Sequence, residues 1–237
     1  MSHSVHPYSH RLGIIRDWKS RWFAVHKSYR TNLKADLIMR KFLTDELRQF
    51  FIANVLIERN QKTIKVVVKT SRPGMIIGRA GDGVVKLRDK VLALLKKKGV
   101  DLAGQELKLD IEEVRSPESN AAIVGLIVAE GLEKRLPFRR VLKQTIEKVM
   151  ANRDVQGVKI KLSGRLGGAE MARQEDLKKG RIPLQTLRAD IDFAREKAHM
   201  TYGDIGIKVW IYKGQIFERD LKVAAQQQTN ASSNNRA

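Results

Sequence analysis

Cysteine is absent from this chain of 237 residues. Disulfide bonds, cysteine-ligated metal sites and a cysteine nucleophile are therefore excluded. Long apolar runs are absent as well: none approaches the roughly 18 residues that a membrane-spanning helix needs, and no secretory signal peptide is recognisable. These absences lead us to expect a cytoplasmic protein with no membrane partner.

The common enzyme motifs are also missing. The sequence has no G-x-x-x-x-G-K-[ST] phosphate loop, no H-E-x-x-H zinc motif and no G-x-S-x-G nucleophile motif. Asp190 and Asp192 share one face of an expected strand, where ion pairing is a better interpretation than metal catalysis. Three histidines lie in a polar N-terminal arm and are interpreted as solvated or RNA-contacting residues rather than metal ligands: His3, His6 and His10. We therefore expect no enzyme, no cofactor, no metal site and no small-molecule substrate.

Acidic residues are few compared with basic ones. Lys and Arg together number 46 against 26 Asp and Glu, for a net charge of +20. Residues 1–116 contain 24 basic and 12 acidic side chains, and residues 117–219 contain 20 and 13. An excess of this sign attracts polyanions, and its presence in both halves excludes a basic tail on a neutral domain. We expect both halves to face nucleic acid, because no amphipathic anchor or lipidation signal favours anionic lipid.

The first half alternates between helical and extended patterns. Apolar residues recur at helical spacing from Leu33 to Leu47, and period-two alternation then predicts strands at residues 55–58 and 64–69. A short helix can follow Pro73, and a longer one begins near Asp82. Alternation at residues 107–112 predicts a last strand. The expected order is therefore α-β-β-α-α-β.

A loop with two glycines, Gly78-Arg79-Ala80-Gly81, lies between the last two of these helices. Glycines have no Cβ atom to hinder the approach of a sugar-phosphate backbone, and the N–H groups that begin the next helix point to the same place. In this order of elements the loop resembles the GxxG loop of a type II KH domain, which clamps about four nucleotides of single-stranded RNA. We predict a KH domain over residues 17–116, after an arm at residues 1–16.

The second half reads as another α+β domain, over residues 117–219. Ser116 and Pro117 look like a helix start, the segment from Ala121 to Leu132 is apolar enough to be largely buried, and a second helix follows Leu136. Three segments are expected to be extended: 158–162, 182–193 and 205–212. We predict two helices on a mostly antiparallel sheet. The polar residues 220–237 are expected to be disordered.

Several groups of residues are candidates for RNA contact. Arg139, Arg140 and Lys143 form an outward stripe on the second of these helices; such a stripe is usually only a solvated face, and Glu147 shares it. Arg165 lies in a glycine-rich loop that either forms a tight turn or binds phosphate, two compatible roles. The complete set of predicted RNA-binding residues is Arg11, Arg16, Arg21, Arg72, Gly78, Arg79, Ala80, Gly81, Arg139, Arg140, Lys143, Arg165, Gly167 and Gly168. The roles of Trp18 and Trp22 in the arm are left open.

Longer motifs resemble one family over about Val5 to Gly214. They are Val5-His6-Pro7, Arg11-Leu12-Gly13, Arg72-Pro73-Gly74, Phe138-Arg139-Arg140, Ser163 to Glu170, Leu187 to Asp192, Thr201-Tyr202-Gly203 and Lys208 to Ile211. The sequence is similar to the bacterial small-subunit ribosomal protein S3 family. The resemblance implies a structural constituent of the small-subunit head that binds ribosomal RNA, contacts ribosomal proteins S10 and S14, and helps line the channel by which messenger RNA enters.

The main alternative is a free-standing KH regulator that binds single-stranded RNA alone. Such a protein would need no second domain rich in these motifs. Sedimentation of a cell extract separates the two interpretations, because only a ribosomal protein migrates with the small subunit.

Overall fold

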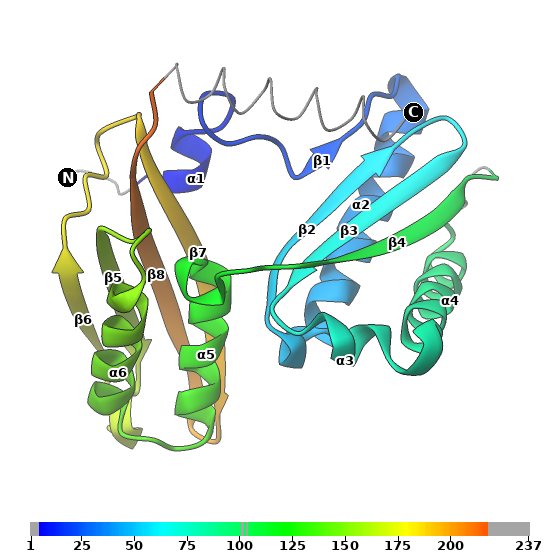
Figure 1. Cartoon of the computed structure of the whole chain (residues 1–237). Helices are drawn as coiled ribbons and strands as arrows, with labels where there is room; N and C mark the ends of the chain where they lie inside the picture. Colours follow the sequence, from blue (N-terminus) through cyan, green and yellow to red (C-terminus); the bar gives the residue numbers. More distant parts are fainter. Residues whose placement is uncertain (1–4, 101, 103, 218–237) are drawn as a thin grey trace.

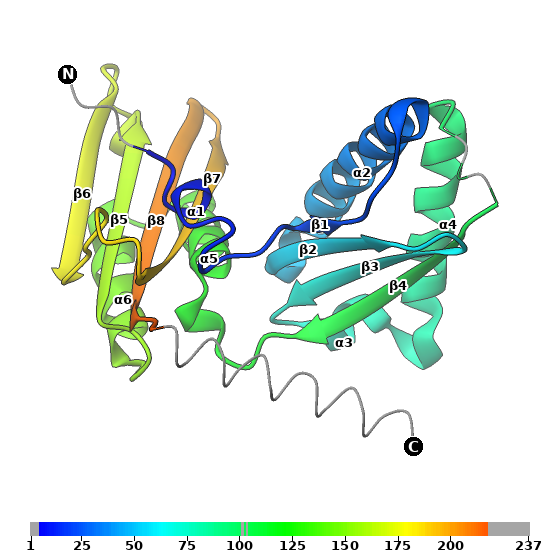
Figure 2. The same ribbon diagram turned by 90° about the horizontal axis from the view of Figure 1, so that it is seen from above.

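The computed structural model describes residues 5–100, 102 and 104–217, which form two units side by side (Figures 1 and 2). Each unit has a four-stranded sheet, with strand order β1-β2-β3-β4 in the first and β6-β5-β8-β7 in the second. His3 and the segment 220–237, predicted to be disordered, lie outside the described residues. Among the described helices, none has the length and apolar character needed to cross a membrane.

The first unit has the predicted α-β-β-α-α-β order. Its main elements are α2 (His26–Glu46), β2 (Ile52–Arg59), β3 (Thr63–Thr70), α3 (Pro73–Ile77), α4 (Asp82–Lys97) and β4 (Glu106–Glu113). Strands β2 and β3 are antiparallel, whereas β3 and β4 are parallel. A parallel neighbour requires a crossover connection, and the segment containing α3 and α4 supplies it.

The buried face of α2 takes in only some of the apolar residues that recur at helical spacing. Leu33 and Leu37 are 49% and 64% exposed. The residues of this helix and its C-cap that pack on the sheet are Ala35, Met39, Leu43 and Leu47. Leu33 and Leu37 therefore lie outside the core, although they share the helical spacing of the buried residues. The helix offers two apolar stripes at a spacing of four, and spacing alone does not say which of them meets the sheet.

A buried ion pair joins α2 to β2. The Arg59 and Asp36 side chains are 4% and 5% exposed, and Arg59 Nε donates to Asp36 Oδ1 at 2.8 Å. Trp22 Nε1 donates to the other carboxylate oxygen at 2.7 Å. The indole of Trp22, whose role the sequence left open, therefore completes the coordination of this buried carboxylate.

The second unit consists of two helices on an antiparallel sheet, as predicted. Its elements are η3 (Pro117–Ser119), α5 (Ala121–Glu133), α6 (Phe138–Ala151), β5 (Gly157–Gly164), η4 (Leu166–Gly168), β6 (Arg173–Gly180), β7 (Ala189–Met200) and β8 (Gly203–Gln215). All strand pairs in this sheet are antiparallel. Both helices lie on one face of the sheet (Figure 1). The core lies between the two helices and the sheet, with Val158, Ile160 and Val209 at 0% exposure.

Three local predictions in this unit need correction. Ser116 and Pro117 begin a 3-10 turn, and α5 starts later, where the Asn120 side chain accepts from the N–H groups of Ala122 and Ile123. The segment 182–193 is extended only from Ala189, because the residues before it form a turn. Strand β6 was missed: it is a charged edge strand, RQEDLKKG, without apolar alternation.

The N-terminal arm connects the two units. Helix α1 (Pro7–His10) packs against β7 of the second sheet, and β1 (Ser20–Arg21) pairs in parallel with β2 of the first. Figure 2 shows this path from one unit to the other. The limits predicted for the domains, at residues 16, 116 and 219, stay predictions.

Candidate nucleic-acid interface

The GxxG loop lies between α3 and α4. Gly78, Ala80 and Gly81 have positive φ angles of 69°, 51° and 86°. Residues 78–80 are exposed, and a Cβ atom added at Gly81 would meet no heavy atom within 4 Å. The space in front of Gly81 is therefore open, and the first N–H groups of α4, at the positive end of its dipole, lie next to it.

The charge around this loop is basic, with one acidic exception. Arg79 is exposed and forms no ion pair with a residue that the structure describes, whereas Asp82 carries a negative charge in the first turn of α4. Arg72, also exposed, stacks its guanidinium over the Phe51 ring at 4.5 Å. Arg79 is thus the cation best placed for a phosphate at the loop, and Arg72 is held nearer the second unit.

Gly83 shapes the same loop, although the sequence motif did not include it. A Cβ atom at this position would lie 2.2 Å from the carbonyl oxygen of Ile76 and 2.9 Å from that of Ile77. The start of α4 therefore touches the end of α3 directly. In the sequence, only the presence of a glycine two residues after Gly81 could have indicated this contact. A glycine is needed there because the two backbones approach closely.

We expect the Gly81→Asp variant of the full chain to bind a short single-stranded RNA at least tenfold more weakly, or about 1.4 kcal/mol. The change places a negative charge where a phosphate would lie. Fluorescence anisotropy with a labelled oligonucleotide measures the affinity, and circular dichroism checks the fold. Gly81→Asn is the matched control, because it has the same shape and backbone demand without the charge. Equal affinities of Gly81→Asp and the wild type would show that this loop is not the clamp.

The predicted stripe on α6 faces outward. Arg139, Arg140 and Lys143 are exposed, as is Glu147. The opposite face of the helix is buried through Val141, Leu142, Thr145, Ile146 and Val149. Arg139 pairs with Glu175 of β6 at 3.3 Å although its side chain is 72% exposed. Arg140 and Lys143 form no ion pair in the part of the chain that the structure describes, so both charges face solvent.

Arg173 extends this basic surface onto β6. Its guanidinium and that of Arg139 each lie 5.6 Å from the centroid of the Phe138 ring. Arg173 also pairs with Glu175 at 3.5 Å. The sequence did not single out Arg173 because the edge strand that carries it was not recognised. The motif Phe138-Arg139-Arg140 was the only signal at this place.

The glycine-rich segment after β5 is a tight turn. Gly167 and Gly168 have φ angles of 69° and 81° and are exposed, while Leu166 is buried. The Arg165 guanidinium donates to the carbonyl oxygens of Ala169 at 2.8 Å and Tyr202 at 3.4 Å, which holds the turn in shape. A Cβ atom at Gly167 would lie 4.0 Å from the Phe138 ring. The turn and the start of α6 therefore form one continuous surface.

The three predicted RNA-binding arginines of the N-terminal arm all make contacts within the protein. Arg11 is 0% exposed, and its guanidinium donates to Ala189 O at 2.6 Å and to the carbonyls of Pro7, Leu184 and Thr186. The prediction that Arg11 binds RNA is wrong, because every one of its nitrogens serves the fold. Arg16 pairs with Asp190 at 2.6 Å in a largely buried contact. The Arg21 side chain is 54% exposed and pairs with Asp17 at the surface, so its contact with RNA stays a prediction.

Asp190 and Asp192, for which the sequence favoured ion pairing over metal catalysis, have separate partners. Asp190 accepts from Arg16, and Asp192 accepts from the backbone N–H of Ala121 at 2.8 Å, at the start of α5. A carboxylate at a helix N-terminus is stabilised by the helix dipole. Both acidic side chains therefore hold the arm and α5 against β7.

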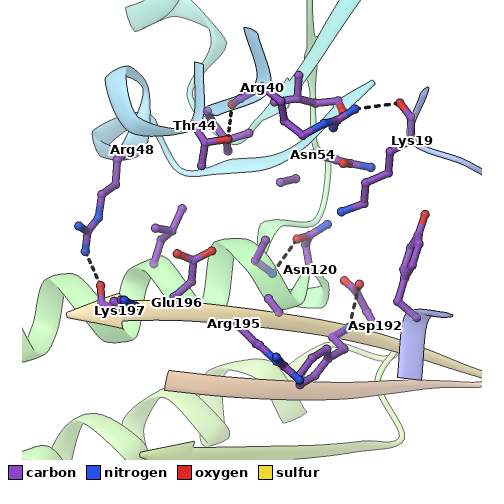
Figure 3. A pocket seen from close by; sticks show the side chains of 18 of the residues that line it. Lys19, Arg40, Thr44, Arg48, Asn54, Asn120, Asp192, Arg195, Glu196 and Lys197 are labelled. Atoms are coloured by element: carbon purple, nitrogen blue, oxygen red, sulfur yellow. Dashed lines mark hydrogen bonds between the residues drawn. The ribbon is translucent and has the colours of Figure 1, made fainter. Parts of the chain in front are cut away.

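A cavity of about 550 Å³ lies between the two units, beside the cluster in which Phe51 packs on Ile123 and Leu126. Figure 3 shows Lys19, Arg40 and Arg48 reaching into it from the first unit, with Asp192 and Glu196 opposite. Its arginines are held by acceptors in and around the cavity. Arg40 donates to Val55 O and Ser20 Oγ, and Arg48 donates to Glu133 and Lys197 O. Burial raises the pKa of Glu196, with Arg48 opposing the shift. The cavity is therefore part of the interface between the two units.

Two family models match the chain. Residues 38–119 match the KH domain, and residues 128–211 match the C-terminal domain of ribosomal protein S3. The chain is a ribosomal protein S3-like protein. Proteins of this family are structural RNA-binding components of the small ribosomal subunit and are not enzymes. The second match also disfavours a free-standing KH regulator, which needs no such domain.

Proposed function

We propose that this S3-like protein is a cytoplasmic constituent of the small-subunit head and helps line the channel by which messenger RNA enters. The observation that carries the proposal is the solvent-facing stripe of Arg139, Arg140 and Lys143 on α6. Two of these cations have no acidic partner among the described residues. Exposed, mobile cations suit a moving polyanion, because they hold its phosphates without fixing one register.

Other surfaces serve assembly in this proposal. Ribosomal RNA contacts the GxxG loop around Arg79 and the turn around Gly167 and Gly168, where backbone and guanidinium donors are open to a phosphate. Ribosomal proteins S10 and S14 are the proposed protein neighbours, on the strength of the family resemblance of the motifs.

The test replaces Arg139, Arg140 and Lys143 together with alanine. Each surface change is expected to alter stability by no more than about 0.5 kcal/mol, so the variant should fold and assemble into subunits. Purified ribosomes with the variant are expected to translate through a messenger hairpin more slowly than the wild type, relative to an unstructured message. The measured quantity is the ratio of the two translation rates.

The control is the alanine triple variant of Lys96, Lys97 and Lys98, exposed cations at and just after the end of α4. It removes the same charge from the other unit and should leave the rate ratio unchanged. An unchanged ratio in the α6 variant would overturn the channel assignment. Loss of assembly in that variant would assign the stripe to ribosomal RNA instead.

A further inference from the structure

The second sheet has a face that α5 and α6 leave uncovered and on which the N-terminal arm packs only at β7. Because side chains alternate along a strand, Val158, Ile160 and Leu162 of β5 point to α5 and α6, and Lys159 and Lys161 point the other way. Figure 1 shows the two helices on the same side of this sheet. We call the opposite side the open face and define it by Lys159, Lys161, Lys178, Arg195, Lys208 and Trp210.

Three cations cross the open face in one row. Lys161 of β5 is the Cα partner of Lys208 of β8, and Lys208 is the partner of Arg195 of β7. Like charges directly opposite each other destabilise a sheet. Across β6, Asp176 is the partner of Lys161, but its carboxylate pairs with Lys159 at 2.9 Å. Neither Lys161 nor Lys208 has an ion-pair partner within residues 5–217 as far as these are described, so no ion pair within the fold accounts for the row.

The next row adds aromatic rings to these charges. Phe193 of β7 and Trp210 of β8 are register partners, with ring centroids 5.1 Å apart. The Lys159 ammonium lies 5.8 Å from the Trp210 ring, and the Arg195 guanidinium lies 5.4 Å from the Phe193 ring. His6 packs edge-on against Phe193, so Trp210 is the ring nearer the open part of the face. Cations interleaved with aromatic rings on a sheet suit single-stranded RNA.

A groove of about 950 Å³ begins at this ring. Its lining includes Trp210, Tyr212 and Leu184 on the apolar side and Lys159, Lys178 and Arg181 on the charged side. Pockets that hold small organic groups are commonly about 300–1,000 Å³. The groove is therefore large enough for a nucleobase beside Trp210, with cations at its rim for the attached phosphate.

We propose that the open face binds a single-stranded segment of the small-subunit ribosomal RNA. Its phosphates lie along the row of Lys161, Lys208 and Arg195, and one base stacks against Trp210. The occupant is ribosomal rather than messenger RNA, because a stacked base is a fixed contact and a moving message cannot keep one. The open face is also on the side of the sheet away from the α6 stripe. The site is thus distinct from the proposed channel, and either assignment can fail alone.

The first test compares two variants of the full chain with the wild type. The open-face variant combines Lys161→Gln, Lys208→Gln and Arg195→Gln. It is expected to bind small-subunit ribosomal RNA at least tenfold more weakly. The slope of log affinity against log salt should fall by about 2, at roughly 0.7 for each phosphate contact with single strands. Gln at Lys96, Lys97 and Lys98 removes the same charge elsewhere and should leave the slope nearly unchanged. Equal slopes for the open-face variant and the wild type would overturn the proposal.

The second test identifies the occupant in assembled subunits. Lys208 is replaced with the photoreactive residue p-benzoylphenylalanine, and purified small subunits are irradiated with and without messenger. A crosslink to ribosomal RNA in both samples is the expected result. A crosslink to a ribosomal protein, a crosslink only to messenger, or no crosslink would each overturn the proposal. The salt measurement does not depend on subunit assembly, so the proposal remains testable if this variant fails to assemble.

Discussion

The Arg59→Met variant is expected to lose about 3–5 kcal/mol of unfolding free energy. Asp36 is 3% exposed, and its carboxylate accepts from Arg59 and Trp22 only, among the described residues. Methionine fills similar space but removes the hydrogen-bonded countercharge of the buried carboxylate, and of the described cations leaves only Arg40 to act on it electrostatically. A buried charge without a partner costs far more than the pair contributes when it is intact. Denaturant titration followed by tryptophan fluorescence measures the loss.

Two controls separate burial from simple loss of a positive charge. Lys65→Met breaks the Lys65–Asp110 pair, whose side chains are 47% and 49% exposed, and should cost at most about 1 kcal/mol. Asp36→Leu combined with Arg59→Met removes both charges and should recover part of the loss, limited by the Trp22 N–H that loses its acceptor. An Arg59→Met protein as stable as the Lys65→Met protein would contradict the role assigned to the Arg59–Asp36 pair.

The order of elements could be predicted from the sequence because period-two and helical patterns are local. The face of a helix that packs on the sheet could not be predicted in this way. On α2, a spacing of four residues fits both the exposed Leu33 and Leu37 and the buried Met39 and Leu43. The decision comes from Asp36, whose partner Arg59 lies 23 residues away and brings that side of the helix onto the sheet. Long-range pairing of this kind leaves no periodic signal.

The candidate interface shows the same division. The exposed GxxG loop and the outward stripe on α6 follow from the loop motif and from helical geometry, both of which are local. Arg173 and the row of Lys161, Lys208 and Arg195 depend on which strands pair, and register between distant strands is not readable from one sequence. Arg11 has the composition of an RNA ligand but bonds to carbonyls more than 170 residues away.

The Arg11→Met variant is expected to release the N-terminal arm from the second sheet and to lose about 3 kcal/mol of unfolding free energy, since charged hydrogen bonds contribute roughly 1.5–3 kcal/mol each. The side chain donates to Ala189 O, Leu184 O and Thr186 O, and so joins the arm to the loop before β7. Methionine leaves these carbonyls without their donor. These carbonyls regain hydrogen bonds only if the arm moves away and admits water. Because water then replaces the lost donor, the loss of unfolding free energy is smaller than the sum of the separate hydrogen bonds.

Limited trypsin digestion and denaturant titration measure this effect together. Cleavage after Arg16 and Lys19 should become faster in the Arg11→Met variant, because a released arm exposes these bonds. Arg21→Met is the control: the Arg21 side chain is 54% exposed, so its stability should stay within about 0.5 kcal/mol of the wild type. An Arg11→Met protein with normal stability and protease resistance, but with RNA affinity as low as that of Gly81→Asp, would show that Arg11 is an RNA ligand after all. The buried geometry predicts the reverse: loss of arm docking comes first, and RNA affinity at the GxxG loop is unchanged as long as the first unit stays folded.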